Sequence, residues 1–295
     1  MTAPILITGG SGQLAQALTA GAAARGLAAR TLGRPEFDFD RPETIDAAFA
    51  TIRPRLVINA AAYTAVDAAE DDEAAALRAN RDGPARLATL ADAADVPLIH
   101  VSTDYVFDGT KGAPYVETDA TAPTGVYGAS KRAGEEAVLA SAARALILRT
   151  SWVYAARGRN FVRAMLAAAA AGRDLRVVAD QRGTPTSAED LASAILDLVT
   201  RVDTGAAEGH WGIYHAAGSG EASWYGFATA IFAEAARFGA PIPPIAAITT
   251  AEWPTRARRP ADSRLDCSRL ATVFGLALPP WRDSLARVVA TLARA

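Results

Sequence analysis

The sequence has very few of the residues that form disulfides or bind metal ions. Its 295 residues include one cysteine and three histidines. Cys267 has no partner for an internal disulfide, and this favours a reducing compartment. The histidines show no metal-ligand spacing with that cysteine, so we expect no metal site; they are His100, His210 and His215.

Long apolar runs and an excess of one charge are also missing. The 30 basic residues nearly balance the 32 acidic residues, and the net charge of −2 argues against nucleic acid as a partner. No apolar run approaches the roughly 18 to 20 residues that span a bilayer. The first ten residues, MTAPILITGG, lead into a strand and lack the features of a signal peptide. We therefore expect a cytoplasmic protein with no membrane partner.

The sequence does contain a repeated alternation of short apolar runs and alanine-rich helical stretches. Continuous apolar strands separated by helices are typical of a parallel sheet that is covered on both faces. The pattern predicts an α/β fold with a doubly wound, Rossmann-type parallel sheet. The expected strands are 4–7, 29–32, 56–58, 97–101 and 146–149, and the expected helices are 12–24, 43–52, 67–94 and 125–142.

After about residue 155 the rhythm changes, which indicates a smaller C-terminal α/β lobe for the substrate. The predicted nucleotide-binding domain is 1–155 plus about 172–204, and the predicted substrate lobe is about 156–171 and 205–295. In this second part we expect helices near 160–171, 187–200, 223–238 and 282–293, strands at 175–178 and 211–216, and irregular segments at 241–244 and 254–264.

A glycine-rich turn follows the first strand directly and opens the first helix. Gly9 suits the tight turn, and Gly12 near the start of the helix lets the backbone approach a pyrophosphate. The helix N-terminus then supplies aligned N–H groups and a partial positive charge. Ala15 takes the third position of the fingerprint, which tolerates alanine. We therefore predict a dinucleotide site here, in preference to a plain strand–helix turn.

The end of the second strand bears on which nicotinamide cofactor binds. An acidic residue there would hold the ribose 2′-OH and repel a 2′-phosphate. This sequence instead has Thr31-Leu32-Gly33-Arg34. Arg34 would neutralise a 2′-phosphate, so NADPH is favoured over NADH. The alternative is a solvent-facing arginine in a loop.

The stretch YGASK places Tyr127 and Lys131 on one face of a helix, about 6 Å apart along its axis. A tyrosine with its ordinary pKa of about 10 is a poor acid at neutral pH. A lysine ammonium beside it would lower that pKa, and the same ammonium would hold the nicotinamide ribose. The small residues 128–130 would leave room for that ribose. Taken alone, however, this spacing occurs in many proteins.

Two further stretches place small or polar residues at the carboxyl ends of strands, where open parallel sheets bind ligands. Ser102 and Thr103 end the fourth strand, and either hydroxyl would hydrogen-bond the substrate oxygen that gains a proton. Residues 59–64, NAAAYT, follow the third strand, and their small side chains permit a cofactor to approach closely. With these neighbours, a proton-handling site at Tyr127 becomes the favoured interpretation.

Together these motifs resemble those of the extended short-chain dehydrogenase/reductases, and within them the dTDP-4-dehydrorhamnose reductases. The matching stretches are TGGxGQ (8–13), NAAAYTAVD (59–67), STDYVFDG (102–109), YGASK (127–131), RTSWVY (149–154) and DQRGTPT (180–186). The resemblance runs from residue 4 to about 290. It implies an oxidoreductase that uses NADPH to reduce the C4 carbonyl of dTDP-4-dehydro-β-L-rhamnose to dTDP-L-rhamnose, a nucleotide-sugar step of cell-surface polysaccharide biosynthesis.

The resemblance also implies roles for individual residues. Tyr127 would protonate the C4 oxygen, Lys131 would lower the pKa of Tyr127 and bind the ribose, and Thr103 would orient the carbonyl. Substrate contacts would come from Thr103, Asp104, Trp152 and Arg259, the last at the diphosphate. From position alone, Trp152 is equally a core residue and Asp104 a turn cap. Cofactor contacts would come from Gly9, Gly12, Gln13, Leu14, Arg34, Asp38, Phe39, Ala62, Tyr63, Thr64, Tyr127 and Lys131.

Two alternative functions stay open. One is another extended short-chain nucleotide-sugar epimerase or reductase; a dehydratase usually has Asp-Glu where this chain has Asp104-Tyr105. The other is a non-catalytic NADP-binding regulatory subunit, and the presence of both Tyr127 and Lys131 counts against it. Some family members form a magnesium-bridged dimer through an acidic residue in the first helix. The matching position here is Ala17, so we expect a monomer or a metal-independent homodimer.

Overall fold

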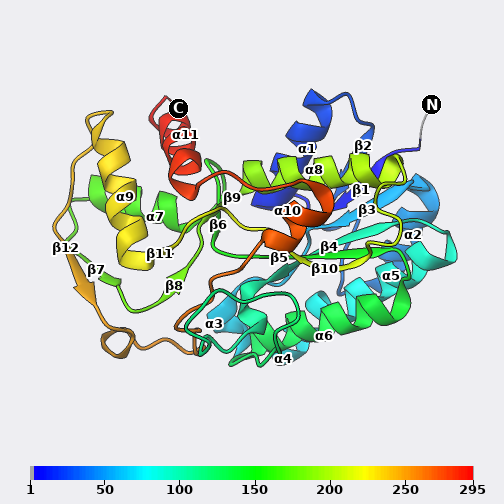
Figure 1. The fold of residues 1–295 in the computed structure, drawn as a ribbon, viewed down its shortest axis with the longest axis horizontal. Coiled ribbons are helices and arrows are strands. Elements are labelled where there is room, and N and C mark those ends of the chain that lie inside the picture. Colours follow the sequence, from blue (N-terminus) through cyan, green and yellow to red (C-terminus); the bar gives the residue numbers. More distant parts are fainter. Residues whose placement is uncertain (1–2, 295) are drawn as a thin grey trace.

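A six-stranded parallel sheet forms the centre of the larger domain in the computed structural model, which describes residues 3–294 (Figure 1). The strand order is β10-β5-β4-β3-β1-β2, and every pairing is parallel. This confirms the predicted doubly wound sheet. The strands are β1 (Ile5–Thr8), β2 (Ala29–Leu32), β3 (Leu56–Asn59), β4 (Leu98–Thr103), β5 (Ala145–Thr150) and β10 (Gly212–His215).

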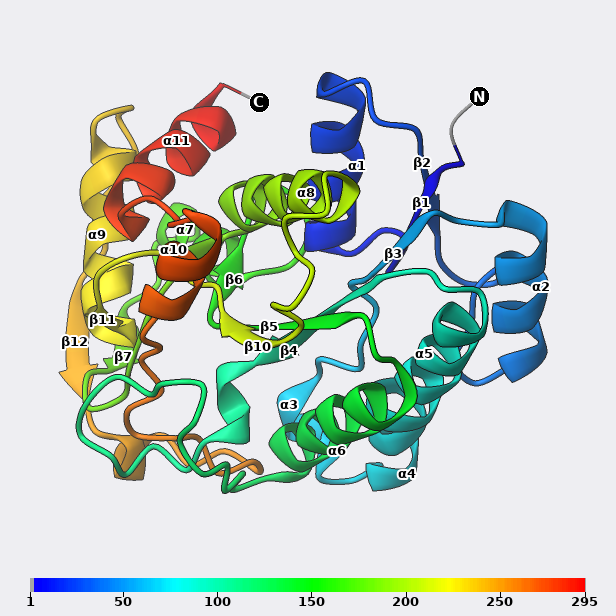
Figure 2. The ribbon, with the colours of Figure 1, turned by 45° about the vertical axis from the view of Figure 1, so that its right-hand side comes forward.

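Helices cover both faces of this sheet because successive strand residues point to opposite faces. Ile5 and Ile7 pack in one apolar cluster with α1 (Gln13–Ala24), α8 (Ala188–Asp203) and α10 (Ser268–Phe274). Leu6 packs in the other cluster, with α2 (Pro42–Ile52), α5 (Gly83–Ala93) and α6 (Val126–Ser141). Figure 2 shows α1 and α8 on one side of the sheet and α5 and α6 on the other. The continuous apolar strands are therefore buried on both faces.

The prediction of one continuous helix over 67–94 is wrong. The structure instead has α3 (Val66–Ala69), α4 (Glu73–Leu77), a π-helical turn η1 (Arg78–Asp82) and α5. The Asp72 side chain accepts a hydrogen bond from the Ala75 N–H at 3.0 Å and so begins α4. The π turn lies where α6 comes closest: a Cβ at Gly134 would lie 1.9 Å from the carbonyl oxygen of Asn80.

The smaller lobe surrounds a third apolar cluster, which includes Phe227 and Trp281. Its helices are α7 (Phe161–Ala170), α9 (Trp224–Ala236) and α11 (Trp281–Ala293). Short strands pair between distant segments: β6 (Val153–Tyr154) with β9 (Thr186–Ser187), β8 (Arg182–Gly183) with β11 (Ala222–Ser223), and β7 (Leu175–Val178) with β12 (Ile245–Ile248). One-turn helices η2 (Asp104–Val106) and η3 (Thr250–Glu252) lie in loops.

Two strands lie in a different lobe from the one expected. We placed 175–178 with the nucleotide-binding domain, but β7 pairs with β12 of the smaller lobe. We placed 211–216 in the substrate lobe, but β10 pairs with β5 as the sixth strand of the large sheet. In each case the partner strand is distant in sequence, so the local pattern did not reveal it. The other lobe boundaries stay a prediction. Within residues 3–294, the helices are all too short or too polar to cross a membrane.

Candidate active site

Glycines shape the turn between β1 and α1. Gly9 and Gly10 have positive φ angles of 108° and 50°, and a Cβ at Gly9 would lie 2.9 Å from the carbonyl oxygen of Ala60. Gly12 precedes the first residue of α1. Within residues 3–294, no side chain caps the backbone N–H groups at the start of this helix. The first N–H groups of α1 are thus available to an anion, and the turn fits the pyrophosphate of a dinucleotide.

The next two predicted cofactor residues differ in their environment. The Gln13 side chain accepts a hydrogen bond at 2.8 Å from Asn160, which lies in the loop before α7. The phosphate turn is thereby joined to the loop 155–160. Leu14 packs in the core beneath the sheet, so only its backbone faces the turn.

The loop after β2 holds the predicted residues for the adenosine part of the cofactor. The Arg34 side chain is 66% exposed and donates to Asp38 and Asp40, with N–O distances of 2.9 and 2.7 Å. Phe39 is buried in the core, where a Cβ at Gly83 would lie 2.1 Å from its ring. Phe39 therefore anchors the loop through its side chain. The role of Arg34 at a 2′-phosphate stays a prediction.

Asn80, which the sequence reasoning missed, connects the segment after β3 to α6. Its side chain accepts from the Tyr63 N–H at 2.8 Å and donates to the Tyr63 carbonyl at 3.0 Å. It also donates to the Ser130 hydroxyl at 2.9 Å. Ala62 and Thr64, on either side of Tyr63, are exposed. The only signal in the sequence that could have identified this connection was an asparagine inside a predicted helix.

The structure brings Thr103 and Tyr127 together at the carboxyl end of β4. Burial raises the pKa of the Tyr127 phenol to about 12, while the nearby Thr103 hydroxyl lowers it and the Asp104 carboxylate raises it. The Tyr127 ring packs edge-on against Tyr105, with 5.6 Å between ring centroids. The expected lowering of this pKa towards neutrality is therefore wrong for this structure, because burial outweighs the favourable contacts.

Lys131 lies one helical turn after Tyr127 and is only 2% exposed. Its ammonium nitrogen is 2.7 Å from the carbonyl oxygen of Val101 and 3.5 Å from Nε2 of His100. The ammonium is thus directed towards β4, which explains why it does not lower the pKa of Tyr127. Burial lowers the pKa of Lys131 to about 8, and the nearby Glu135 carboxylate acts in the opposite direction.

Gly128 has a packing role that the sequence did not predict. That the small residues 128–130 leave room for the ribose stays a prediction. A Cβ at Gly128 would lie 2.1 Å from the carbonyl oxygen of Tyr105. The missing side chain therefore lets α6, which contains Tyr127, pack closely against η2, which follows Thr103.

Asp104 begins η2 and is almost completely buried, at 1% exposed. Thr103 donates to its Oδ1 at 3.0 Å, whereas its Oδ2 has no hydrogen-bond partner among residues 3–294. Burial raises the pKa of this carboxyl to about 6, although the neighbouring Ser263 and Thr103 hydroxyls lower it. An unpaired carboxylate oxygen beside Tyr127 is a suitable acceptor for a sugar hydroxyl.

Trp152 and Arg259, the other two predicted substrate residues, are held by different kinds of contact. Trp152 follows β5 with a positive φ of 47°, and its ring stacks on Trp224 of α9 with 3.6 Å between centroids. Arg259 lies in the irregular segment 254–264 and forms two hydrogen bonds with the carboxylate of Asp67, at 2.9 and 3.1 Å. The roles of both residues in substrate binding stay predictions.

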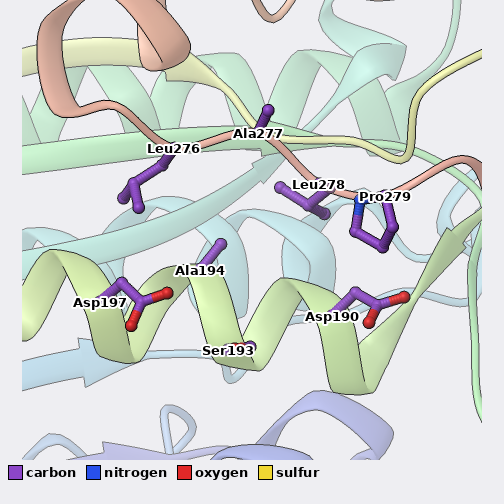
Figure 3. A pocket seen from close by; sticks show the side chains of 8 residues that line it. All are labelled: Asp190, Ser193, Ala194, Asp197, Leu276, Ala277, Leu278 and Pro279. Carbon is purple, nitrogen blue, oxygen red and sulfur yellow. The ribbon is translucent and has the colours of Figure 1, made fainter.

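A small cavity lies elsewhere in the molecule. It has a volume of about 100 Å³ and lies between α8 and the segment 276–279 (Figure 3). The carboxylates that line it are already paired, Asp190 with Arg287 and Asp197 with Arg25. The cavity shares no lining residue with the Tyr127 site, so it does not compete with that site as the reaction centre. Residues 3–294 contain no group of three or more potential metal ligands.

The comparisons with known proteins agree with each other over almost the whole chain. A family described as RmlD substrate binding domain matches residues 2–294. A dTDP-4-dehydrorhamnose reductase of Sinorhizobium fredii is 45% identical over 97% of this chain and 96% of its own length. The corresponding enzyme of Burkholderia thailandensis is 43% identical over 98% of each chain. The crystal structure of dTDP-4-dehydrorhamnose reductase from Bacillus anthracis in complex with NADP has a TM-score of 0.91 and 32% identity, over 99% of this chain and 100% of that one.

Proposed function

Because the chain belongs to the dTDP-4-dehydrorhamnose reductases, the family of the RmlD substrate binding domain, we propose that it reduces the C4 carbonyl of dTDP-4-dehydro-β-L-rhamnose with NADPH. The chain is thus an oxidoreductase of nucleotide-sugar biosynthesis. The observation that best supports this reaction is the meeting of Thr103, Tyr127 and Lys131 at the carboxyl end of β4, on the same sheet edge as the phosphate turn.

Two residues handle the proton in this proposal. Bound NADPH supplies the hydride that the C4 carbon gains. Thr103 redirects its single hydroxyl hydrogen from Asp104 to the C4 oxygen and orients that oxygen towards the Tyr127 phenol. Tyr127 then gives its proton to that oxygen, which completes the alcohol. The Lys131 ammonium, one helical turn after Tyr127, holds the ribose of the bound cofactor.

The raised pKa of Tyr127 suits a reductase. A phenol with a pKa of about 12 is fully protonated at neutral pH, which is the form that a proton donor needs. The C4 oxygen becomes an alkoxide as the hydride arrives, and an alkoxide is a stronger base than the phenolate. The proton therefore moves downhill from Tyr127 to the substrate without any prior ionisation of the tyrosine.

Three further residues hold the substrate in this proposal. The free Oδ2 of Asp104 accepts a hydrogen bond from a sugar hydroxyl. Trp152 contacts the sugar ring through the part of its indole that Trp224 leaves uncovered. Arg259 binds the diphosphate, and it would exchange part of its contact with Asp67 for the new anion.

Activity is expected to fall on both sides of neutral pH. Deprotonation of Lys131 above about pH 8 removes the ammonium, and protonation of Asp104 below about pH 6 removes the hydroxyl acceptor. The profile of kcat/KM for the sugar, measured from pH 5 to 10, should therefore be bell-shaped. Lys131→Arg keeps a positive charge at every pH and should lose the alkaline limb. A wild-type rate that stays constant up to pH 10 would contradict the role of Lys131.

The reaction itself is tested by incubating the protein with dTDP-4-dehydrorhamnose and NADPH. We expect a loss of absorbance at the reduced-nicotinamide band, in equal amount to the dTDP-L-rhamnose formed, and none when the sugar is omitted. An epimerase would interconvert sugars without net oxidation of NADPH, and a regulatory subunit would bind NADPH without turnover. Either result would contradict the proposed reaction.

We also propose that the protein works in the cytoplasm, as a monomer or as a homodimer that needs no metal. The lone Cys267 suits a reducing compartment. Ala17, which stands where some relatives have an acidic residue for a magnesium bridge, packs partly buried against the core cluster of α1. An alanine there offers no oxygen to a magnesium ion.

A further inference from the structure

His100 is a fully buried imidazole beneath Lys131, and it has no part in the chemistry described above. It lies in β4 and is 0% exposed. Its Nε2 is 3.5 Å from the Lys131 nitrogen, and its Nδ1 is 2.9 Å from the side-chain nitrogen of Asn59 in β3. Burial and the neighbouring Lys131 hold the pKa of His100 well below its ordinary value, so the ring is neutral.

The neighbours of His100 determine which of its two nitrogens carries the proton. The Thr8 hydroxyl donates to Oδ1 of Asn59 at 2.6 Å, and the Ala61 N–H is 3.3 Å from the same oxygen. The amide oxygen of Asn59 is therefore occupied, and its NH₂ group faces His100. Nδ1 must then accept a hydrogen bond, and a neutral imidazole has only one N–H. That N–H is on Nε2, and it points at the Lys131 nitrogen.

An N–H that points at an ammonium group destabilises the ammonium form, because both groups are hydrogen-bond donors. Among residues 3–294, the Val101 carbonyl is then the only protein acceptor that bonds the Lys131 nitrogen, so the remaining ammonium hydrogens are directed away from β4, towards the cofactor side. We propose that His100, fixed as its Nε2–H tautomer by Asn59 and Thr8, is a positioning residue that directs Lys131 and limits its ammonium form. This inference rests on the proposed function of Lys131.

The same chain of contacts reaches the phosphate turn. Thr8 is the residue immediately before Gly9, and its hydroxyl also accepts from the Ala61 N–H at 3.2 Å. Thr8 and Asn59 are both almost completely buried. The backbone at the turn is therefore connected to the catalytic lysine through three side chains, all of them shielded from water.

Other charged and titratable groups lie on the elements around Lys131, and the test leaves them unchanged. On α6, Glu135 raises the pKa of Lys131, and Tyr127 lies one turn before it. On β5, Arg149 forms a two-bond ion pair with Glu135. The group on η2 is Asp104.

The test is a switch of the His100 tautomer by Asn59→Asp. A carboxylate of the same shape can accept from Thr8 with one oxygen and from an Nδ1–H of His100 with the other. Nε2 would then accept a hydrogen bond from Lys131, and the ammonium form would be favoured. We expect the alkaline limb of kcat/KM to move upwards by about one pH unit, which corresponds to about tenfold more ammonium at a pH above the limb.

A double-mutant cycle separates this effect from the new negative charge. His100→Asn removes Nε2, and we expect it to move the alkaline limb upwards by itself. Adding Asn59→Asp to His100→Asn should then give no further movement. If the two shifts simply add, the introduced carboxylate acts directly on Lys131 and the inference is overturned. The inference is also overturned if neither single variant moves the alkaline limb.

Two more variants separate the proposed effect from a general loss of stability and from the introduced charge. His215→Asn removes the other fully buried imidazole of the same sheet; it should lower the melting temperature and leave the limb in place. Thr8→Val removes the shorter of the two hydrogen bonds to the amide oxygen of Asn59 and so favours rotation of the amide, which should move the limb in the same direction as Asn59→Asp. This variant tests the inference without introducing a charge.

Titrations of NADPH binding against pH provide a readout that needs no sugar. If the wild type binds NADPH but never oxidises it with the sugar, the proposed reaction fails, and the pH dependence of NADPH affinity in the same variants still tests His100. If the wild type turns over and neither kcat/KM nor NADPH affinity changes its pH dependence in Asn59→Asp, the inference about His100 fails alone.

Discussion

Replacing Tyr127 with phenylalanine is expected to lower kcat by about 10²- to 10⁴-fold, the usual contribution of a positioned proton donor. The aromatic ring and its edge-on contact with Tyr105 are retained, so NADPH should bind with nearly unchanged affinity. The measurement is kcat for the sugar, together with the dissociation constant of NADPH from fluorescence titration.

Tyr214→Phe is the matched control for this substitution. Tyr214 is also buried and lies in β10 of the large sheet. Its hydroxyl donates to the backbone carbonyl of His210 at 2.6 Å. Its removal should lower stability and leave kcat nearly unchanged. A Tyr127→Phe enzyme that works at the wild-type rate would show that the proton comes from another group, and Thr103 would be the next candidate.

Replacing Glu135 with glutamine is expected to destabilise the fold by about 3–5 kcal/mol, the usual cost of leaving one member of a buried ion pair without its partner. Glu135 and Arg149 are each only 3% exposed and share two hydrogen bonds, and Ser102 donates to the same carboxylate. The measurement is the free energy of unfolding in urea. Because Glu135 also raises the pKa of Lys131, the alkaline limb of kcat/KM should move downwards in this variant.

The neighbouring residue provides a control on the same helix. Glu136 forms an ion pair with Arg132, but its side chain is 62% exposed. Solvent screens this pair, so Glu136→Gln should change the free energy of unfolding by less than about 0.5 kcal/mol. Equal effects of the two substitutions would show that Arg149 finds another partner when Glu135 is neutral.

The sequence predicted the elements whose pattern is local. Strands β1 and β3 are short, largely apolar runs, β4 and β5 contain such runs, and the phosphate turn is a local glycine pattern, so all of these were visible in the printed sequence. The positions of β7 and β10 were not, because each strand is placed by a partner that is distant in the chain. Local periodicity carries no information about such pairings.

The electrostatics of the site were the least predictable part. Spacing correctly placed Tyr127 and Lys131 on one helix face, but it did not reveal that the ammonium is directed towards β4. The polar residues behind the site, Asn80 and His100, lie within a helical stretch and an apolar strand. Their contacts depend on the packing of α6 against β3 and β4, and no sequence motif encodes that geometry.

The stacked indoles of Trp152 and Trp224 have an optical consequence. They join the end of β5 to α9, so the two lobes share one pair of parallel chromophores 3.6 Å apart. The strong far-ultraviolet transitions of two indoles at this distance couple as an exciton and give a paired band in circular dichroism. The strength of that band depends steeply on their separation and angle. The protein therefore contains an intrinsic spectroscopic gauge of how its two lobes are arranged, one that needs no added label.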